Sequence, residues 1–197
     1  MPYHCRDGRC LGMGIYSDEE LKKLGLKSVG VNVRISDKAS IYSPADIEIG
    51  DNVRIDDFCI LSGKIKIGNY IHIAPYTAFF GGKEGIFVGD FSNFSSKISV
   101  YAISDDYSGK TMTNPMVPDQ YKNVEHHAVK IGKHCIFGCG CTVLPGVTIG
   151  DGAAFGAMSL IRDSCNQWAI YAGIPCRKIK DRSRELLALE EKLLENE

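Results

Sequence analysis

An apolar residue recurs at every sixth position through three long runs of this 197-residue chain. A second small or aliphatic residue usually follows four positions later, and glycine or another small residue often follows directly. A period of six fits neither the 3.6-residue period of a helix nor the two-residue alternation of a single strand. It is typical of a short strand, a tight turn and another short strand. The first series comprises Ile35, Ile41, Ile49, Ile55, Leu61, Ile67, Ile73, Phe79, Val88, Phe94, Val100, Ile131, Phe137, Val143, Ile149, Phe155 and Ile161.

Three such units form one triangular coil, with a large side chain pointing inward from each unit. Stacked coils then pair as parallel strands about 4.8 Å apart. A β-sandwich would instead show alternation broken every 8–12 residues. The repeat therefore predicts an all-β fold, a parallel β-helix over residues 31–165. Counting from Ile67 assigns successive units to three faces, which we call A, B and C: face A holds Ile67, Val88, Ile131 and Ile149, face B holds Ile73, Phe94, Phe137 and Phe155, and face C holds Phe79, Val100, Val143 and Ile161.

One polar stretch, SDDYSGKTMTNPMVPDQY (residues 104–121), interrupts the repeat. It belongs to an external loop, residues 101–130, that leaves after face C and returns on face A. A shorter break at residues 81–85 leaves from the same corner one coil earlier. Long irregular insertions in a compact domain are usually functional. We therefore expect the loop to carry part of a site.

The two ends of the chain have helical signals. Residues 1–30 form an N-terminal segment in which Ser17 and Glu20 make a capping box that opens a short helix ending near Gly25. Residues 166–197 form a C-terminal turn and a short helix whose leucines lie along one side. That stripe is expected to cover the open end of the coil or to pack against a neighbouring subunit. Its residues are Leu186, Leu189, Leu193 and Leu194.

Charge and cysteine content narrow the classes of function. The 23 basic and 24 acidic residues nearly cancel, which argues against nucleic acid or a membrane surface as partner. The chain has no long apolar run and its start lacks a signal peptide, so we expect a cytoplasmic protein. Of eight cysteines, four occupy the second repeat position, where a compact apolar side chain fits. Packing is therefore favoured over a metal site, since the C-x3-C-x-C group at residues 135–141 is not a zinc spacing.

Two C-terminal stretches, IGKHCIFGCGCTVLPGVTIGDGAAFGAMSLI and WAIYAGIPCRKIK, resemble the hexapeptide-repeat acyltransferases. The stretch IYAISDDYSGKTMTNPMVP is similar to the branch that acylates sugars, which includes galactoside and O-antigen acetyltransferases and N-acyltransferases of nucleotide-linked 4-amino-6-deoxysugars. The resemblance implies a left-handed helix, a homotrimer, and acyl-CoA as co-substrate in a groove between adjacent prisms, with no metal. The positions it assigns to CoA are Gly138, Gly156, Ala157, Trp168, Gly173, Arg177 and Lys178.

This resemblance implies acetyl or short-acyl transfer to the amine of a nucleotide-linked deoxyaminosugar in surface polysaccharide or O-antigen biosynthesis. Transfer to a sugar hydroxyl is the alternative. Acyl transfer from a thioester requires a base near the acceptor and donors for the developing oxyanion. Galactoside acetyltransferase-like enzymes supply a loop histidine, whereas this loop has Ser104-Asp105-Asp106-Tyr107 at the matching place.

Two hypotheses for the base remain open. In the first, Asp105 or Asp106 serves, aided by the hydroxyl of Ser95; the competing interpretation of the acids is a capped turn. In the second, the base is His72 or His134, which the unit count places on face A, where the loop returns. For the acceptor sugar or nucleobase, the loop offers Tyr107, Asn114 and Tyr121.

Two other functions are alternatives for a chain with this repeat. A γ-carbonic anhydrase-like metal site requires three converging histidines, and the spacing of His126, His127 and His134 does not provide them. A non-catalytic scaffold would not bind CoA.

Overall fold

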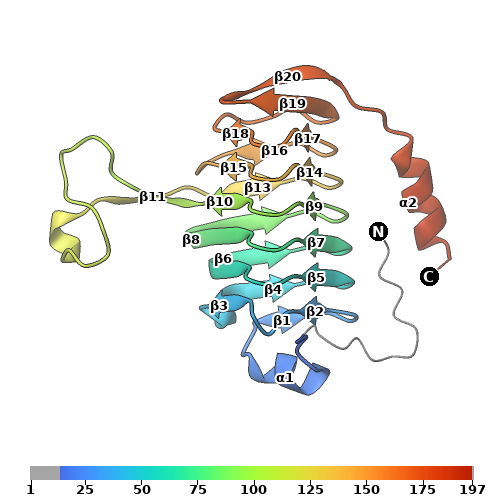
Figure 1. Ribbon diagram of the computed structural model, residues 1–197, viewed down its shortest axis with the longest axis horizontal. Coiled ribbons are helices and arrows are strands. Elements are labelled where there is room, and N and C mark those ends of the chain that lie inside the picture. Colours follow the sequence, from blue (N-terminus) through green and yellow to red (C-terminus); the bar gives the residue numbers. More distant parts are fainter. Residues whose placement is uncertain (1–13, 197) are drawn as a thin grey trace.

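The computed structural model describes residues 14–196, so the chain's first residues, including Cys5 and Cys10, lie outside the described part. The chain winds into a column of stacked three-sided coils (Figure 1). Helix α1 (Asp18–Lys23) lies at its N-terminal end, opened by the predicted capping box of Ser17 and Glu20. Among the described residues no helix is long and apolar enough to cross a bilayer.

Face B is an eight-stranded sheet, parallel except for its last pair. Its strands are β2 (Arg34–Ile35), β5 (Val53–Ile55), β7 (Ile71–Ile73), β9 (Asn93–Phe94), β14 (Ile136–Phe137), β17 (Ala154–Phe155), β19 (Ala169–Gly173) and β20 (Cys176–Asp181). Strand β20 turns back antiparallel to β19. The β-helix thus ends in a hairpin, and the β20 edge terminates the face.

Faces A and C share one ten-stranded sheet because the two long strands β6 (Ile60–Ile67) and β8 (Ala78–Val88) run around the corner between them. The corner break predicted at residues 81–85 lies within β8. Face A adds β1 (Ser28–Val29), β4 (Ile47–Ile49), β13 (Val129–Ile131) and β16 (Thr148–Ile149); face C adds β3 (Ser40–Tyr42), β10 (Ser99–Tyr101), β15 (Thr142–Val143) and β18 (Leu160–Ile161). A short 3-10 helix, η1 (Pro44–Asp46), fills the corner below.

The six-residue repeat marks the core. Of its seventeen large apolar positions, sixteen are buried, and only Ile41, in the first coils, is half-buried. On face B the inward rings of Phe94, Phe137, Phe155 and Tyr171 stack in one column, with centroids 4.7, 5.0 and 5.5 Å apart. Each coil therefore packs on the next through identical positions, which is why a short period suffices to build a long core.

The glycines that follow many core positions have a different role from the one their sequence positions suggest. Glycine tolerates the positive φ that sharp corners need, but the described residues with positive φ are mainly non-glycine, such as Asn52 (φ 57°) and Phe91 (φ 59°). At Gly50 and Gly138 a Cβ would lie 2.7 Å from the backbone of Gly68 and 2.5 Å from the nitrogen of Ala157. These glycines allow adjacent coils to approach closely.

The four cysteines at the second repeat position are free and buried, as their packing role predicts. Burial raises the pKa of Cys59 to about 11 and those of Cys135 and Cys165 to about 12, so they stay protonated at neutral pH. Cys139 is exposed.

We therefore predict that maleimide at pH 8 labels Cys139 rapidly. The thiols of Cys59, Cys135 and Cys165 should stay unmodified until the protein unfolds. Peptide mass spectrometry after timed labelling measures this. Labelling of Cys135 at the rate of Cys139 would contradict the packing.

Candidate active site

The external loop folds into an arm that stands away from the column (Figure 1). We call residues 102–128, between β10 and β13, the flap. Its base is an antiparallel hairpin of β11 (Ile103–Asp105) and β12 (Val124–His126), in which Asp105 lies opposite Val124. A 3-10 helix, η2 (Asp119–Tyr121), forms part of its outer end. The tip exposes apolar side chains, with Tyr107 94% and Met116 90% exposed.

A pocket of about 960 Å³ lies between the flap and the adjoining corner of face C. We call it the flap pocket. Its wall from the coil includes Phe80 and Tyr101, whose rings stack 5.1 Å apart. Its wall from the flap includes Asp105, Tyr107, Asn114 and Lys122. The pocket thus combines an aromatic surface, one carboxylate and one amine, which suits a ligand with an aromatic base and charged groups.

The hairpin separates the two adjacent acids. Asp105 lines the pocket together with Ile103, Ser104 and Tyr107, whereas Asp106 does not line it. Asp106 instead accepts hydrogen bonds from the Ser108 hydroxyl and amide at 2.9 and 2.7 Å, and from the Thr111 hydroxyl at 2.8 Å. The Ser108 hydroxyl in particular lowers the pKa of Asp106. Asp106 is a capped-turn residue, and Asp105 is the acid available to a ligand.

The predicted acceptor contacts divide in the same way. Tyr107 and Asn114 line the pocket, whereas Tyr121 does not and is 54% exposed. Lys122, Phe80 and Tyr101 were not identified from sequence. Phe80 directly follows the core residue Phe79, and Tyr101 directly follows the core residue Val100 one coil later. Their equivalent places in the repeat are the sequence feature that could have identified them.

The positions proposed for CoA lie mostly along one edge of face B. Ser95, Gly138 and Gly156 follow core residues in successive coils and donate their amides to the next coil, the first at 3.1 Å to Phe137 O and the other two at 2.8 Å. Ala157 follows Gly156, and Ala172 of β19 is paired with Arg177 of β20. Small side chains therefore form a continuous row along this edge. Within the row, Ser95 contributes a hydroxyl group.

The cations at the top of this row are solvent-exposed. The Arg177 guanidinium is 3.7 Å from Asp163, and Lys178 pairs with Asp181 at 2.6 Å, which raises the pKa of Lys178. Gly173 lies opposite Cys176 in the same hairpin. Arg177 and Lys178 therefore extend from the end of the row into solvent.

Trp168 is separated from this group. It precedes β19, at the opposite end of face B from Gly156, and is only 7% exposed. The Arg184 guanidinium lies over its ring at 5.6 Å, and its six-membered ring fills the space beside Gly152. The family resemblance assigned Trp168 to CoA, but the chain's own C-terminal segment packs against it.

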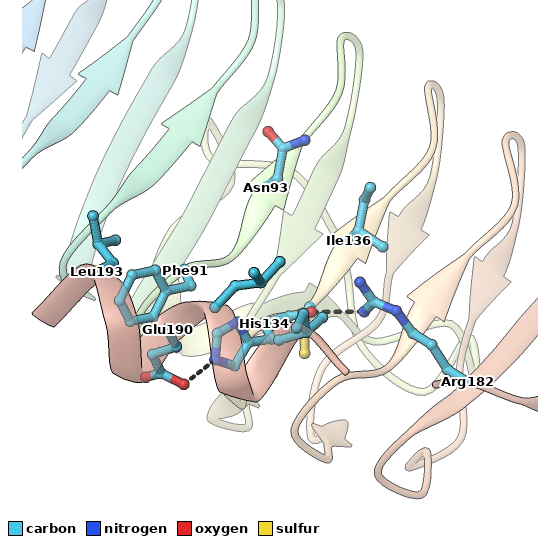
Figure 2. A pocket seen from close by; sticks show the side chains of 10 residues that line it. Phe91, Asn93, His134, Ile136, Arg182, Glu190 and Leu193 are labelled. Carbon is cyan, nitrogen blue, oxygen red and sulfur yellow. Dashed lines mark hydrogen bonds and ion pairs between the residues drawn. The ribbon is translucent and has the colours of Figure 1, made fainter. Parts of the chain in front are cut away.

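His134 is also enclosed by the C-terminal segment (Figure 2). Its ring stacks on Phe91 at 5.0 Å, and its Nε2 is 2.7 Å from Glu190 Oε2 of α2 (Leu186–Leu194). Arg182 donates to the carbonyl of His134 at 2.8 Å. The side chain of His134 is 8% exposed. It anchors the helix and does not line the flap pocket.

The same contacts locate helix α2. It packs along the corner between faces A and B, on the opposite side of the column from the flap in Figure 1. It does not cover the open end of the coil, which was one of the two expectations for its leucine stripe. Leu189 and Leu193 remain 66% and 44% exposed.

The placement of His72 on face A is wrong. It lies in β7 on face B, paired with Arg54 and Asn93, whereas the flap returns to face A through β13. Its Nε2 is 2.7 Å from Asp56, which also binds Arg54 at 2.6 Å. The face adjacency that favoured His72 as base is absent, and neither it nor His134 lines the flap pocket.

The histidines of the metal hypothesis do not converge either. His126 Nδ1 accepts a hydrogen bond from the Lys83 amide at 3.3 Å, His127 faces Glu125, and His134 lies under α2. Within residues 14–196 no three His, Cys, Asp or Glu side chains form a group suited to a metal ion.

Comparison with known proteins gives the same fold. Residues 128–163 match the family model described as bacterial transferase hexapeptide (six repeats). The chain is 49% identical over 179 residues to a dTDP-4-amino-4,6-dideoxy-D-glucose acyltransferase of Escherichia coli, covering 89% of this chain and 93% of that relative. It is 54% identical to AntD, an N-acyltransferase from Bacillus cereus solved with dTDP and 3-hydroxybutyryl-CoA; the TM-score is 0.91, covering 93% of this chain and 98% of AntD. The left-handed β-helix is confirmed.

Further AntD structures carry a substituted serine or a substituted aspartate, and the two positions lie ten residues apart in that protein. The serine variant was solved with dTDP-4-amino-4,6-dideoxyglucose and CoA, at 53% identity and a TM-score of 0.91, covering 94% of this chain and 100% of AntD.

Proposed function

This chain belongs to the hexapeptide-repeat acyltransferases, and we propose that it transfers a short acyl group from acyl-CoA to the amine of a nucleotide-linked 4-amino-4,6-dideoxysugar. The similarity to enzymes of that activity extends over nine-tenths of the chain. The observation that carries the proposal is the flap pocket, in which Asp105 faces an aromatic surface. Among the described residues that line the pocket there is no histidine, which favours an amine acceptor over a hydroxyl.

Asp105 is the proposed base. The spacing of the serine and aspartate altered in AntD is matched here by Ser95 with Asp105 and by Ser96 with Asp106. The hydrogen bonds that occupy Asp106 leave Asp105 as the acid in a pocket. Ser95 then corresponds to the serine, in agreement with its place in the row of small residues.

In this mechanism Asp105 orients the acceptor amine and takes a proton from it as the nitrogen attacks the thioester carbonyl. The C–N bond forms, the C–S bond breaks, and the CoA thiolate leaves and is protonated. In this proposal the Ser95 hydroxyl of a neighbouring chain donates to the developing oxyanion. Binding the amine beside the thioester supplies most of the remaining acceleration, and no covalent enzyme intermediate is required.

A homotrimer is part of the proposal. Ser95 begins the turn at the start of face C, whereas the flap leaves from the other end of β10. One chain therefore does not bring Ser95 and Asp105 to one point, but the flap stands away from the column (Figure 1), and in the proposed trimer it contacts a neighbour. Light scattering should give three times the 21.6 kDa of one chain. A monomer with full activity would exclude this arrangement.

The direct test uses acetyl-CoA with dTDP-4-amino-4,6-dideoxyglucose and follows the acylated product by mass spectrometry. The matched control is dTDP-6-deoxyglucose, which has a hydroxyl in place of the amine. We expect product from the first only. Acylation of the second at a similar rate would favour sugar O-acetylation instead. A role in surface polysaccharide synthesis, in the cytoplasm where CoA and nucleotide sugars occur, belongs to the same proposal.

The cations of β20 are proposed to bind the phosphates of CoA. A guanidinium suits phosphate geometry, and the contacts of Arg177 are the exposed Asp163 at 3.7 Å and the Cys176 carbonyl at 3.0 Å. We predict that Arg177→Ala raises the Kd for CoA roughly three- to tenfold, since the site is partly screened by solvent. Isothermal titration measures this. Lys180→Ala, an exposed cation on the same strand, is the control and should not change the Kd.

A further inference from the structure

Lys122 is the one cation among the described residues that line the flap pocket. Its side chain is 10% exposed, so nearly the whole stem is packed. Its Nζ lies 2.9 Å from Asp119, three residues earlier, whose side chain is fully exposed. That pairing lowers the pKa of Asp119.

The ion pair with Asp119 offsets the positive charge of Lys122 only in part. An ammonium that is removed from water requires a close anionic partner. A carboxylate in full contact with solvent interacts weakly, because water screens it and its side chain remains mobile. An anion bound inside the pocket would interact with Lys122 in a less solvated setting than Asp119 does. The pocket is thus prepared for a ligand with negative charge.

The hairpin brings this cation to the same pocket as Asp105. Asp105 pairs with Val124, Lys122 lies two residues before Val124, and all three line the flap pocket. Two residues of an extended strand span roughly 7 Å. A pyranose ring with an amine at C4 and a phosphate at C1 separates its two charged groups by a similar span. Asp105 and Lys122 therefore give the flap pocket one acidic and one basic group for the two charged ends of such a sugar.

We propose that Lys122 binds the diphosphate of the nucleotide-linked sugar and so selects nucleotide-linked sugars over free sugars. This inference rests on the proposed function. With the diphosphate at Lys122, the amine is directed to Asp105, and the stacked rings of Phe80 and Tyr101 offer a surface in the same pocket. Lys122 in this role recognises the substrate and takes no part in proton transfer.

The test compares Lys122→Met with Asp119→Asn by titration with dTDP. Methionine keeps most of the buried stem while removing the charge. We expect Lys122→Met to weaken dTDP binding roughly 10- to 100-fold, since a hydrogen bond between charged groups is lost. Asp119→Asn removes the competing carboxylate, so dTDP should bind as tightly as in the wild type or more tightly. Thymidine, which has no phosphate, should bind wild type and Lys122→Met equally.

A purely structural ion pair predicts a different pattern. If Lys122 only holds the flap, Lys122→Met and Asp119→Asn should weaken dTDP binding by similar factors, and thymidine binding should fall with them. That result, or unchanged dTDP affinity in a folded Lys122→Met protein, would overturn the inference while leaving the proposed acylation intact. Failure of the wild type to bind dTDP would instead remove the proposed acceptor class together with this inference. Lys122→Arg, which keeps the charge, should retain dTDP binding.

Discussion

Replacing Asp105 with asparagine should lower kcat by roughly 10²- to 10⁴-fold, the usual contribution of a positioned base. Asparagine preserves the size of the side chain and its ability to hydrogen-bond the amine, but its amide does not accept a proton as a carboxylate does. The side chain lines the pocket from a regular hairpin, so the substitution should leave the flap folded. Turnover of the dTDP-aminosugar by mass spectrometry measures the change.

Asp106→Asn is the matched control because it alters the neighbouring acid in the same way. Its carboxylate caps a turn through Ser108 and Thr111, so we expect a modest loss of flap order and turnover within a few-fold of wild type. The Kd for CoA should be unchanged in both variants. Full activity in Asp105→Asn, or a larger loss in Asp106→Asn, would reject Asp105 as base.

Replacing Phe137 with alanine should destabilise the protein by about 3–5 kcal/mol. The ring is fully buried and is stacked on both sides, by Phe94 at 4.7 Å and by Phe155 at 5.0 Å. Its removal leaves a cavity between coils that the closely spaced backbone does not collapse to fill. For a chain of this size the midpoint of thermal unfolding should fall by roughly 6–20 °C.

Thr148→Ala is the control for Phe137→Ala, because Thr148 occupies an exposed strand position of the column. Its midpoint should stay within about 2 °C of wild type, because exposed substitutions usually change stability by less than about 0.5 kcal/mol. If the unfolding midpoint fell equally in Phe137→Ala and Thr148→Ala, the stacked rings would not dominate the stability of the coil. Calorimetry on both proteins decides this.

The candidate site was only partly predictable from sequence. The interruption of the repeat located the flap, and the pair Asp105-Asp106 was noted within it. Which acid faces a ligand depends on where β11 ends and on the turn that Asp106 caps through Ser108 and Thr111. The hypothesis that His72 or His134 is the base fails to place these residues at the flap pocket for a related reason. His72 lies on a different face from the returning flap, and His134 is covered by a helix that is distant in sequence.

The sequence by itself determined the fold, because each hexapeptide places one large side chain inward and the same contact is repeated from coil to coil. A local period is therefore enough to specify a core in which each residue packs on the equivalent residue of the next coil, eighteen positions away in the shortest coils, as from Ile55 to Ile73. The tertiary structure alone decided the flap pocket and the covering of Trp168 and His134. These depend on contacts between segments with no shared period, such as Glu190 with His134, and no local pattern encodes them.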